Sequence, residues 1–241
     1  MNISGLQAGK HWLKHNKHPG IRALCRFIKK LRVADIPVPK FPCQLLYFLH
    51  QSLTGAIAFL LRTFYWTPLF KSQLVRYGQS LYLYGGLPHI SGPLHISLGN
   101  DCRISAQTTF SGRNSQVKGH PQKPTLLIGN NCDIGWMTTI AVGKQIIIGN
   151  NVRIAGRAFL AGYPGHPVNA GNRAQGAPDT DDQVRNIVIE DDAWLATGVS
   201  VMAGVRIGKG SIIASGSVVT RDIPPGVLAG GIPAVVIKKL D

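Results

Sequence analysis

The stretch at residues 187–234 reads IVIEDDAWLATGVSVMAGVRIGKGSIIASGSVVTRDIPPGVLAGGIPA and contains the most regular repeat of the chain. Within it an aliphatic side chain returns at every sixth position, at Ile189, Leu195, Val201, Ile207, Ile213 and Val219. The same spacing occurs in three earlier runs, at Leu98, Ile104 and Phe110, at Ile128, Ile134, Ile140 and Ile146, and at Ile148, Ile154 and Leu160. A second series lies four residues after positions of the first and holds compact side chains: Cys102, Cys132, Val152, Ala193, Val205, Ser211 and Ser217.

A repeat of six fits neither the period of an α-helix nor the two-residue alternation of a half-buried strand. It fits a triangular coil in which each hexapeptide forms one short strand and one corner, so that three hexapeptides complete a turn of about 18 residues. The aliphatic side chain then points into the column, and the compact one fits where the backbone bends. The sequence therefore predicts a mainly β fold of three parallel sheets.

This pattern resembles the hexapeptide-repeat acyltransferases over residues 85–237, and the ending SGSVVTRDIPPGVLAGGIPA is similar to the terminal signature of their maltose, galactoside and sugar O-acetyltransferase branch. The resemblance implies a left-handed parallel β-helix, a homotrimer, and acetyl-CoA or a longer acyl-CoA as acyl donor. Trimer formation is also expected because small residues leave the flanks of a lone coil uncovered.

Two excursions interrupt the repeat, at residues 111–125 and 161–187, and long excursions from a rigid scaffold are often functional. The second carries His166-Pro167, and the resemblance implies that a His-Pro pair at this place supplies the catalytic base. An imidazole titrates near neutral pH, so it can take a proton from a hydroxyl and return it to a thiolate. His120-Pro121 in the first excursion is the competing pair. Since G-x-S-x-G is absent, direct transfer is favoured over an acyl-enzyme.

The resemblance also implies a binding site for the long CoA molecule along stacked coils. Thr197 and Ser215 lie one coil apart and should line the pantetheine, with Ala203 and Gly204 on the neighbouring corner. The remaining residues expected at the CoA site are an outward-pointing aromatic residue beside the cleft and a pair near the phosphates: Trp194, and Thr220 with Arg221.

The second excursion supplies the residues expected to hold the acceptor, Tyr163, Asn169 and Arg173. Two departures from the sugar branch bear on the acceptor. The stretch 136–139 lacks the Asn that the branch often places near the base, and the acidic residues that hold its acceptor have no clear counterpart, although Asp179, Asp181 and Asp182 lie in the same excursion.

Residues 1–80 are predicted to form a region distinct from the coil domain at 81–241. They hold 12 of the 26 Lys and Arg but one acidic residue, within a net charge of +15. Residues 20–33 have the pattern of a basic amphipathic helix, and residues 43–61 form an apolar run with a polar centre. These features favour docking on an anionic membrane surface; helices packed on a soluble domain are the alternative. No nucleic-acid recognition motif accompanies the charge.

These observations predict an O-acyltransferase that acetylates a sugar hydroxyl of a cell-surface or lipid-linked glycan precursor. The expected location is the cytoplasm, at the inner face of the inner membrane where residues 1–80 dock. Two alternatives are a small soluble sugar as acceptor and a non-catalytic β-helix that acts as a membrane or assembly scaffold. A zinc enzyme on the same coil is disfavoured because the histidines lack a close H-x4-H pair, so no metal is expected. A nucleotidyltransferase would need a Gly-rich loop before the repeats.

Overall fold

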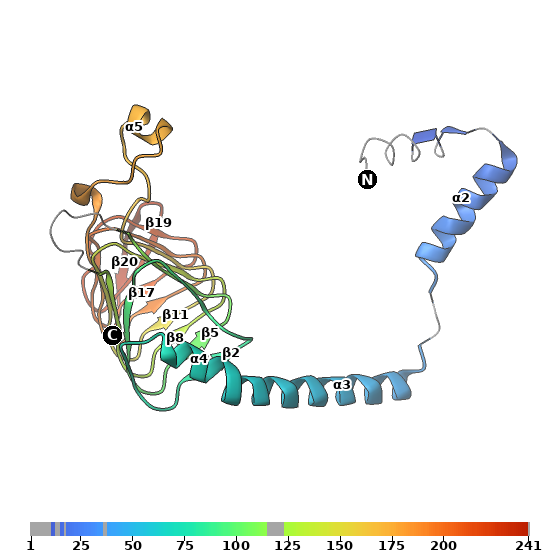
Figure 1. The fold of residues 1–241 in the computed structure, drawn as a ribbon, viewed down its shortest axis with the longest axis horizontal. Coiled ribbons are helices and arrows are strands. Elements are labelled where there is room, and N and C mark those ends of the chain that lie inside the picture. The colour runs from blue at the N-terminus through green and yellow to red at the C-terminus, as the bar shows by residue number, and fades with distance from the viewer. Residues whose placement is uncertain (1–10, 13–14, 17, 36–37, 115–122, 241) are drawn as a thin grey trace. The chain divides into compact units, whose positions relative to one another are not determined.

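The computed structural model of the chain describes residues 11–12, 15–16, 18–35, 38–114 and 123–240. The chain divides into two compact units, residues 1–53 and 54–241. The first holds helix α2 (Pro19–Arg32) and the start of helix α3 (Lys40–Leu61), and the second holds all the strands (Figure 1).

Helix α2 confirms the helix expected at residues 20–33. Pro19 stands in the first turn, where a missing N–H costs no hydrogen bond, and Lys29, Lys30 and Arg32 lie in the last turn, where the helix dipole favours cations. None of its residues is buried. Its apolar face, with Leu24 among others, is therefore exposed in this chain.

Helix α3 contains the whole apolar run expected at residues 43–61, and it also has no buried residue. Consecutive exposed residues such as Leu45, Leu46, Tyr47 and Phe48 place apolar side chains on every face of the helix. With the segments that follow it, α3 forms a helical stretch, Lys40–Ser72, whose length and composition would let it cross a bilayer, a weak criterion that some core helices and signal sequences also meet.

The π-helical turn η1 (Arg62–Trp66) and helix α4 (Thr67–Ser72) lead from α3 into the coils. The Arg62 guanidinium lies 4.2 Å from the centre of the Tyr82 ring. Phe70 in α4 is buried, and its ring centre lies 6.1 Å from that of Phe110. Helix α4 therefore covers the open end of the apolar interior of the coils.

The strands form three sheets that run the length of the coil. Sheet 1 contains, in order, β1 (Arg76–Tyr77), β4 (His95–Leu98), β7 (Thr125–Ile128), β10 (Gln145–Ile148), β13 (Ile187–Ile189) and β16 (Arg206–Ile207). Sheet 2 contains β2 (Tyr82–Tyr84), β5 (Arg103–Ser105), β8 (Asp133–Ile134), β11 (Arg153–Ile154), β14 (Trp194–Leu195), β17 (Ile212–Ile213), β19 (Val227–Gly231) and β20 (Ala234–Lys239). Sheet 3 contains β3 (His89–Ser91), β6 (Thr109–Gly112), β9 (Thr139–Val142), β12 (Phe159–Ala161), β15 (Ser200–Met202) and β18 (Val218–Val219).

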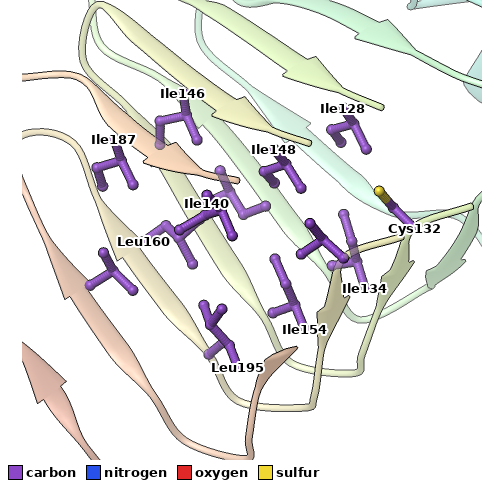
Figure 2. Packing of buried hydrophobic residues seen from close by; sticks show 14 of the residues in the cluster. Ile128, Cys132, Ile134, Ile140, Ile146, Ile148, Ile154, Leu160, Ile187 and Leu195 are labelled. Carbon is purple, nitrogen blue, oxygen red and sulfur yellow. The ribbon is translucent and has the colours of Figure 1, made fainter. Parts of the chain in front are cut away.

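The interior confirms both series of the repeat. Every residue of the six-residue series is at most 5% exposed, and the compact residues are at most 2% exposed. Equivalent residues of successive coils stack in register, as Ile128, Ile148 and Ile189 do in sheet 1. The side chains of Ile128 and Ile148 point into the column, as do those of Ile134 and Ile154 from the next sheet (Figure 2). The fold is the left-handed parallel β-helix that the resemblance implies.

The coil differs from the sequence expectation at both ends. It begins at β1, before residue 81, because Arg76 and Tyr77 already pair with β4. It ends in an antiparallel pair, β19 with β20, which the six-residue repeat does not predict. The excursions are slightly shorter than expected, since β6 continues to Gly112 and β13 begins at Ile187.

Candidate active site

Both excursions leave the coil at the same corner, where sheet 3 passes into sheet 1. The first follows β6 and the second follows β12, and the coil between them turns tightly at Gly143 between β9 and β10. A Cβ atom on Gly143 would lie 2.3 Å from Val184 Cγ1 and 2.6 Å from the Gly162 carbonyl oxygen. The second excursion thus packs back over this corner, and only glycine leaves it room.

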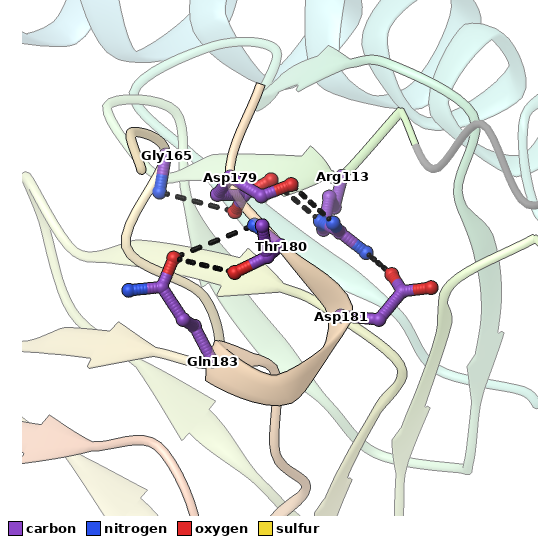
Figure 3. A network of polar contacts seen from close by, with 6 residues as sticks. All are labelled: Arg113, Gly165, Asp179, Thr180, Asp181 and Gln183. Carbon is purple, nitrogen blue, oxygen red and sulfur yellow. Dashed lines mark hydrogen bonds and ion pairs between the residues drawn. The ribbon is translucent and has the colours of Figure 1, made fainter. Parts of the chain in front are cut away.

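A buried ion pair joins the two excursions (Figure 3). Arg113, at the start of the first, donates from Nε to Asp179 Oδ1 over 2.7 Å and from a terminal nitrogen to the Asp179 carbonyl oxygen over 2.9 Å. Its other terminal nitrogen donates to Asp181 Oδ1 over 2.5 Å. The side chains of Arg113 and Asp179 are 7% and 6% exposed. Burial lowers the pKa of Arg113. The hydrogen bonds to the two carboxylates raise this pKa by more than burial lowers it, so the net shift is upward.

His166 follows directly on this cluster. The Gly165 N–H donates to Asp179 Oδ2 over 3.3 Å, and Gly165 has a φ of +78°, a conformation that other residues rarely adopt. The residue after His166, Pro167, is buried, while His166 itself is exposed. The backbone on both sides of the imidazole is therefore held, and the ring faces solvent.

Two of the three residues expected to hold the acceptor are engaged within the loop itself. Asn169 caps the short helix α5 (Ala170–Ala174), where its side chain accepts from the Asn172 N–H over 3.0 Å. Arg173 donates to the carbonyl oxygens of Pro167 and Val168 over 3.0 and 2.8 Å. Both residues shape the loop that carries His166. Tyr163 is partly exposed.

The residues expected at the CoA site fall into two groups. Thr197 and Ser215 are exposed on the corner between sheets 2 and 3, and they stack as the repeat predicts, because the Gly216 N–H donates to the Thr197 carbonyl over 2.9 Å. Trp194 lies nearby on the outer face of sheet 2, paired with Arg153 and Ile212, and is 47% exposed.

The second group lies at the corner from which the excursions leave. Ala203 and Gly204 follow β15, and Thr220 and Arg221 follow β18 in the next coil. The Gly204 N–H donates to the Asn186 carbonyl over 3.0 Å, which ties this corner to the end of the His166 excursion. The two groups sit at opposite ends of the sheet 3 strands and therefore do not converge within one chain.

The described residues contain no group of three His, Cys, Asp or Glu side chains that could hold a metal ion. His89 and His95 lie on different sheets, in β3 and β4. The competing pair His120-Pro121 lies outside the described residues. At the stretch that lacks the expected Asn, the guanidinium of Arg157 lies 4.9 Å from the centre of the Trp136 ring.

The structure adds Arg113 and Gly165 to the candidate site, which sequence reasoning missed. Arg113 and Asp179 are 66 positions apart and both lie where the repeat is broken, so no period connects them. A signal was present in composition alone: Asp179 and Asp181 stand in an excursion of a chain with only 11 acidic residues.

A model of the family described as bacterial transferase hexapeptide (six repeats) matches residues 186–221. The chain is 40% identical over 104 residues to a galactoside O-acetyltransferase of Lactococcus lactis, covering 43% of this chain and 45% of that protein. It is 37% identical over 114 residues to the galactoside O-acetyltransferase of Escherichia coli K12, covering 47% and 54%. The chain thus spans about half the length of the curated relatives it matches.

Among solved structures, a point mutant of AntD, an N-acyltransferase from Bacillus cereus in complex with dTDP-4-amino-4,6-dideoxyglucose and coenzyme A, superposes with a TM-score of 0.58. The match covers 73% of this chain and 89% of that one at 18% identity, and at that identity it supports the fold alone. The chain is thus similar to the hexapeptide-repeat transferases in its six-residue repeat and buried interior series, and similar to the galactoside O-acetyltransferases over about half of its length.

Proposed function

We propose that the protein is an acyl-CoA-dependent O-acyltransferase that moves acetyl from acetyl-CoA to a sugar hydroxyl, with His166 as general base. The observation that carries this proposal is the place of His166, an exposed imidazole on a held backbone beside a hexapeptide coil. The matched relatives named galactoside O-acetyltransferases support the acyl group and the sugar class of acceptor.

In the proposed reaction both substrates are bound together. The imidazole takes the hydroxyl proton as the oxygen attacks the thioester carbonyl carbon, and the C–S bond breaks when the tetrahedral intermediate collapses. The proton then passes from the imidazolium to the departing thiolate. Direct transfer fits the cysteines of the coil, since Cys102 and Cys132 are buried and donate to the carbonyl oxygens of Gly129 and Gly149. The hydrogen bond with Cys102 and burial both raise the pKa of Cys132, which opposes a nucleophilic role.

A homotrimer completes the proposed acyl-CoA site. The corner with Thr197 and Ser215 and the corner with Ala203 and Thr220 lie at opposite ends of sheet 3, so one chain cannot line both sides of a narrow channel. Two neighbouring chains that face each other through different corners could. No metal takes part in this proposal.

The proposed acceptor is a glycan precursor held at a membrane, as a lipid-linked sugar is. Helix α3 has apolar side chains on every face and no buried residue, and α2 adds five basic residues. Such a pair suits a bilayer interface with anionic headgroups, since lipid tails can cover α3 and the headgroups can neutralise α2. The proposed location is the cytoplasmic face of the inner membrane, where acetyl-CoA is present.

The test is an acyl-transfer screen of the full-length protein with acetyl-CoA against lipid-linked and free sugars. We expect acetyl transfer to a sugar by the wild type, and His166→Ala should lower kcat by about 10²–10⁴-fold because a general base is lost. His89→Ala, which removes an exposed imidazole from β3, serves as the matched control and should turn over normally. Normal turnover by His166→Ala would reject the proposed base.

A second candidate is a non-catalytic scaffold on a membrane, and the exposed α3 favours it equally. It predicts neither acetyl transfer nor a rise in melting temperature on adding CoA. A CoA-dependent rise would exclude it, because a ligand stabilises the folded state only by binding to it.

A further inference from the structure

We infer that Arg113 and Asp179 form a buried latch whose task is to position His166, so that both are positioning residues for the transfer. This inference rests on the proposed function, because it assigns the latch a role in the reaction of that site. The latch is defined by the two side chains and by the Gly165 N–H that Asp179 also accepts.

The Arg113 end of the latch is fixed by the coil. Its backbone N–H donates to the Val142 carbonyl over 2.9 Å, so the residue continues the ladder of sheet 3 directly after β6. Its guanidinium then uses three nitrogens, two on Asp179 and one on Asp181. A planar guanidinium offers these donors in fixed directions, which a lysine ammonium cannot reproduce.

Asp179 connects Arg113 to the loop that carries His166. One carboxylate oxygen accepts from Arg113, and the other accepts from the N–H of Gly165, the residue before His166. On the far side, Arg173 holds the carbonyl oxygens of Pro167 and Val168. The loop therefore receives its position from the coil through Asp179, while the imidazole remains free to meet substrates.

Burying the charges of Arg113 and Asp179 costs free energy, which argues that the pair has a specific role. Two charges with side chains 7% and 6% exposed lose their hydration, and such pairs are often no more stabilising than apolar residues of the same size. The benefit of the ion pair is geometric, because this position needs a side chain with two acceptor oxygens, one for Arg113 and one for Gly165. An asparagine offers one, and its amide nitrogen would face either the Arg113 or the Gly165 donor.

The test uses three like-for-like substitutions in the full-length protein with acetyl-CoA and the best sugar from the screen. Asp179→Asn should lower kcat by about 10–100-fold, since a misplacement of about 1 Å costs rates of that order, and should leave the KM for acetyl-CoA within about twofold. Asp181→Asn, which removes one contact at the half-exposed edge, should have a smaller effect. Asp182→Asn is the matched control, because its exposed side chain takes no part in the latch.

Combination with His166→Ala separates positioning from a general loss of structure. If Asp179 acts through the imidazole, Asp179→Asn should lower turnover no further in the His166→Ala background. Amide exchange of the loop 161–187 should also be faster in Asp179→Asn than in Asp182→Asn. If Asp179→Asn does not fold, Arg113→Lys, which keeps the charge, takes its place in the same cycle with the same expected results.

Two results would overturn the inference: Asp179→Asn with the kcat of Asp182→Asn, or a further loss when it is added to His166→Ala. The failure of the proposed function looks different. In that case His166→Ala itself retains full turnover. If only the latch fails, His166→Ala is still slowed, and Asp179→Asn either matches Asp182→Asn or adds a further loss to His166→Ala.

Discussion

Glu190 shows how one residue joins two coils at a corner. It follows β13 at the position that Gly149 occupies one coil earlier, as the pairing of Ile189 with Ile148 shows. Its Oε1 accepts from the Arg206 guanidinium over 2.6 Å, and its Oε2 accepts from the Lys209 N–H over 2.9 Å. The hydrogen bond from Arg206, followed by that from Lys209, lowers the pKa of Glu190 below its ordinary 4.5.

This lowered pKa predicts a pH-dependent contribution to stability. A carboxylate whose pKa is lower in the folded state stabilises the fold above its unfolded value, and the contribution is lost as pH falls through the folded pKa. Glu190→Gln should therefore melt below the wild type at pH 7, by up to about 4 °C given the exposure of the pair, and the difference should vanish well below pH 4.5. Thermal melts of both proteins across this range measure it.

Asp182→Asn is the control for the loss of one acidic charge, and its melting temperature should stay parallel to the wild type at each pH. A gap between Glu190→Gln and the wild type that persisted at low pH would contradict the ion-pair account.

At the scale of elements, the corner between sheets 1 and 2 is held by a ladder of side chains. Each side-chain oxygen in this ladder accepts a hydrogen bond from a backbone N–H of the preceding coil. Asn130 accepts from Asn100 over 2.8 Å, Asn150 from Asn130 over 2.8 Å, and Asp191 from Asn150 over 2.6 Å. Polar ladders of this kind satisfy backbone donors where the strands end. The ladder fixes the stacking of the coils along one edge while the buried aliphatic series fixes it inside.

The position of a residue in the fold could be predicted from the sequence where the residue belongs to the six-residue repeat. The interior positions followed from the repeat because each residue, such as Ile140, has the same environment as its neighbours six positions away. The Asn ladder also had a signal, since Gly-Asn recurs at residues 99–100, 129–130 and 149–150, but the spacing alone does not say which atoms accept. The latch had no such signal, because Arg113 and Asp179 meet only after the second excursion folds back over Gly143.

At the scale of the whole molecule, α2 and α3 present apolar side chains to solvent. Both helices lack buried residues, and α3 exposes apolar side chains all round. The structure also indicates where a truncation would do harm: Phe70 of α4 is part of the core, and β1 belongs to sheet 1. Substitution of basic residues in the whole chain is therefore a cleaner test of membrane binding than removal of residues 1–80.

Replacing Arg22, Arg26 and Lys29 of α2 with Gln should weaken binding to vesicles that contain phosphatidylglycerol by about 100-fold at low salt, at about 1 kcal/mol for each basic residue near an anionic surface. Sedimentation with vesicles measures the partition. The charge-conserving variant, with Arg and Lys exchanged at these positions, is the control and should bind as the wild type does. Equal binding of wild type and Gln variant would show that charge on α2 plays no part.

The proposed reaction requires the His166 imidazole to lie close to the sulfur of bound CoA. A crystal structure of the protein with CoA bound measures this distance. We predict that the sulfur lies about 3–4 Å from the His166 ring, in a channel between two chains with Thr197 and Ser215 on one wall. CoA bound at a corner remote from the His166 loop would contradict the account.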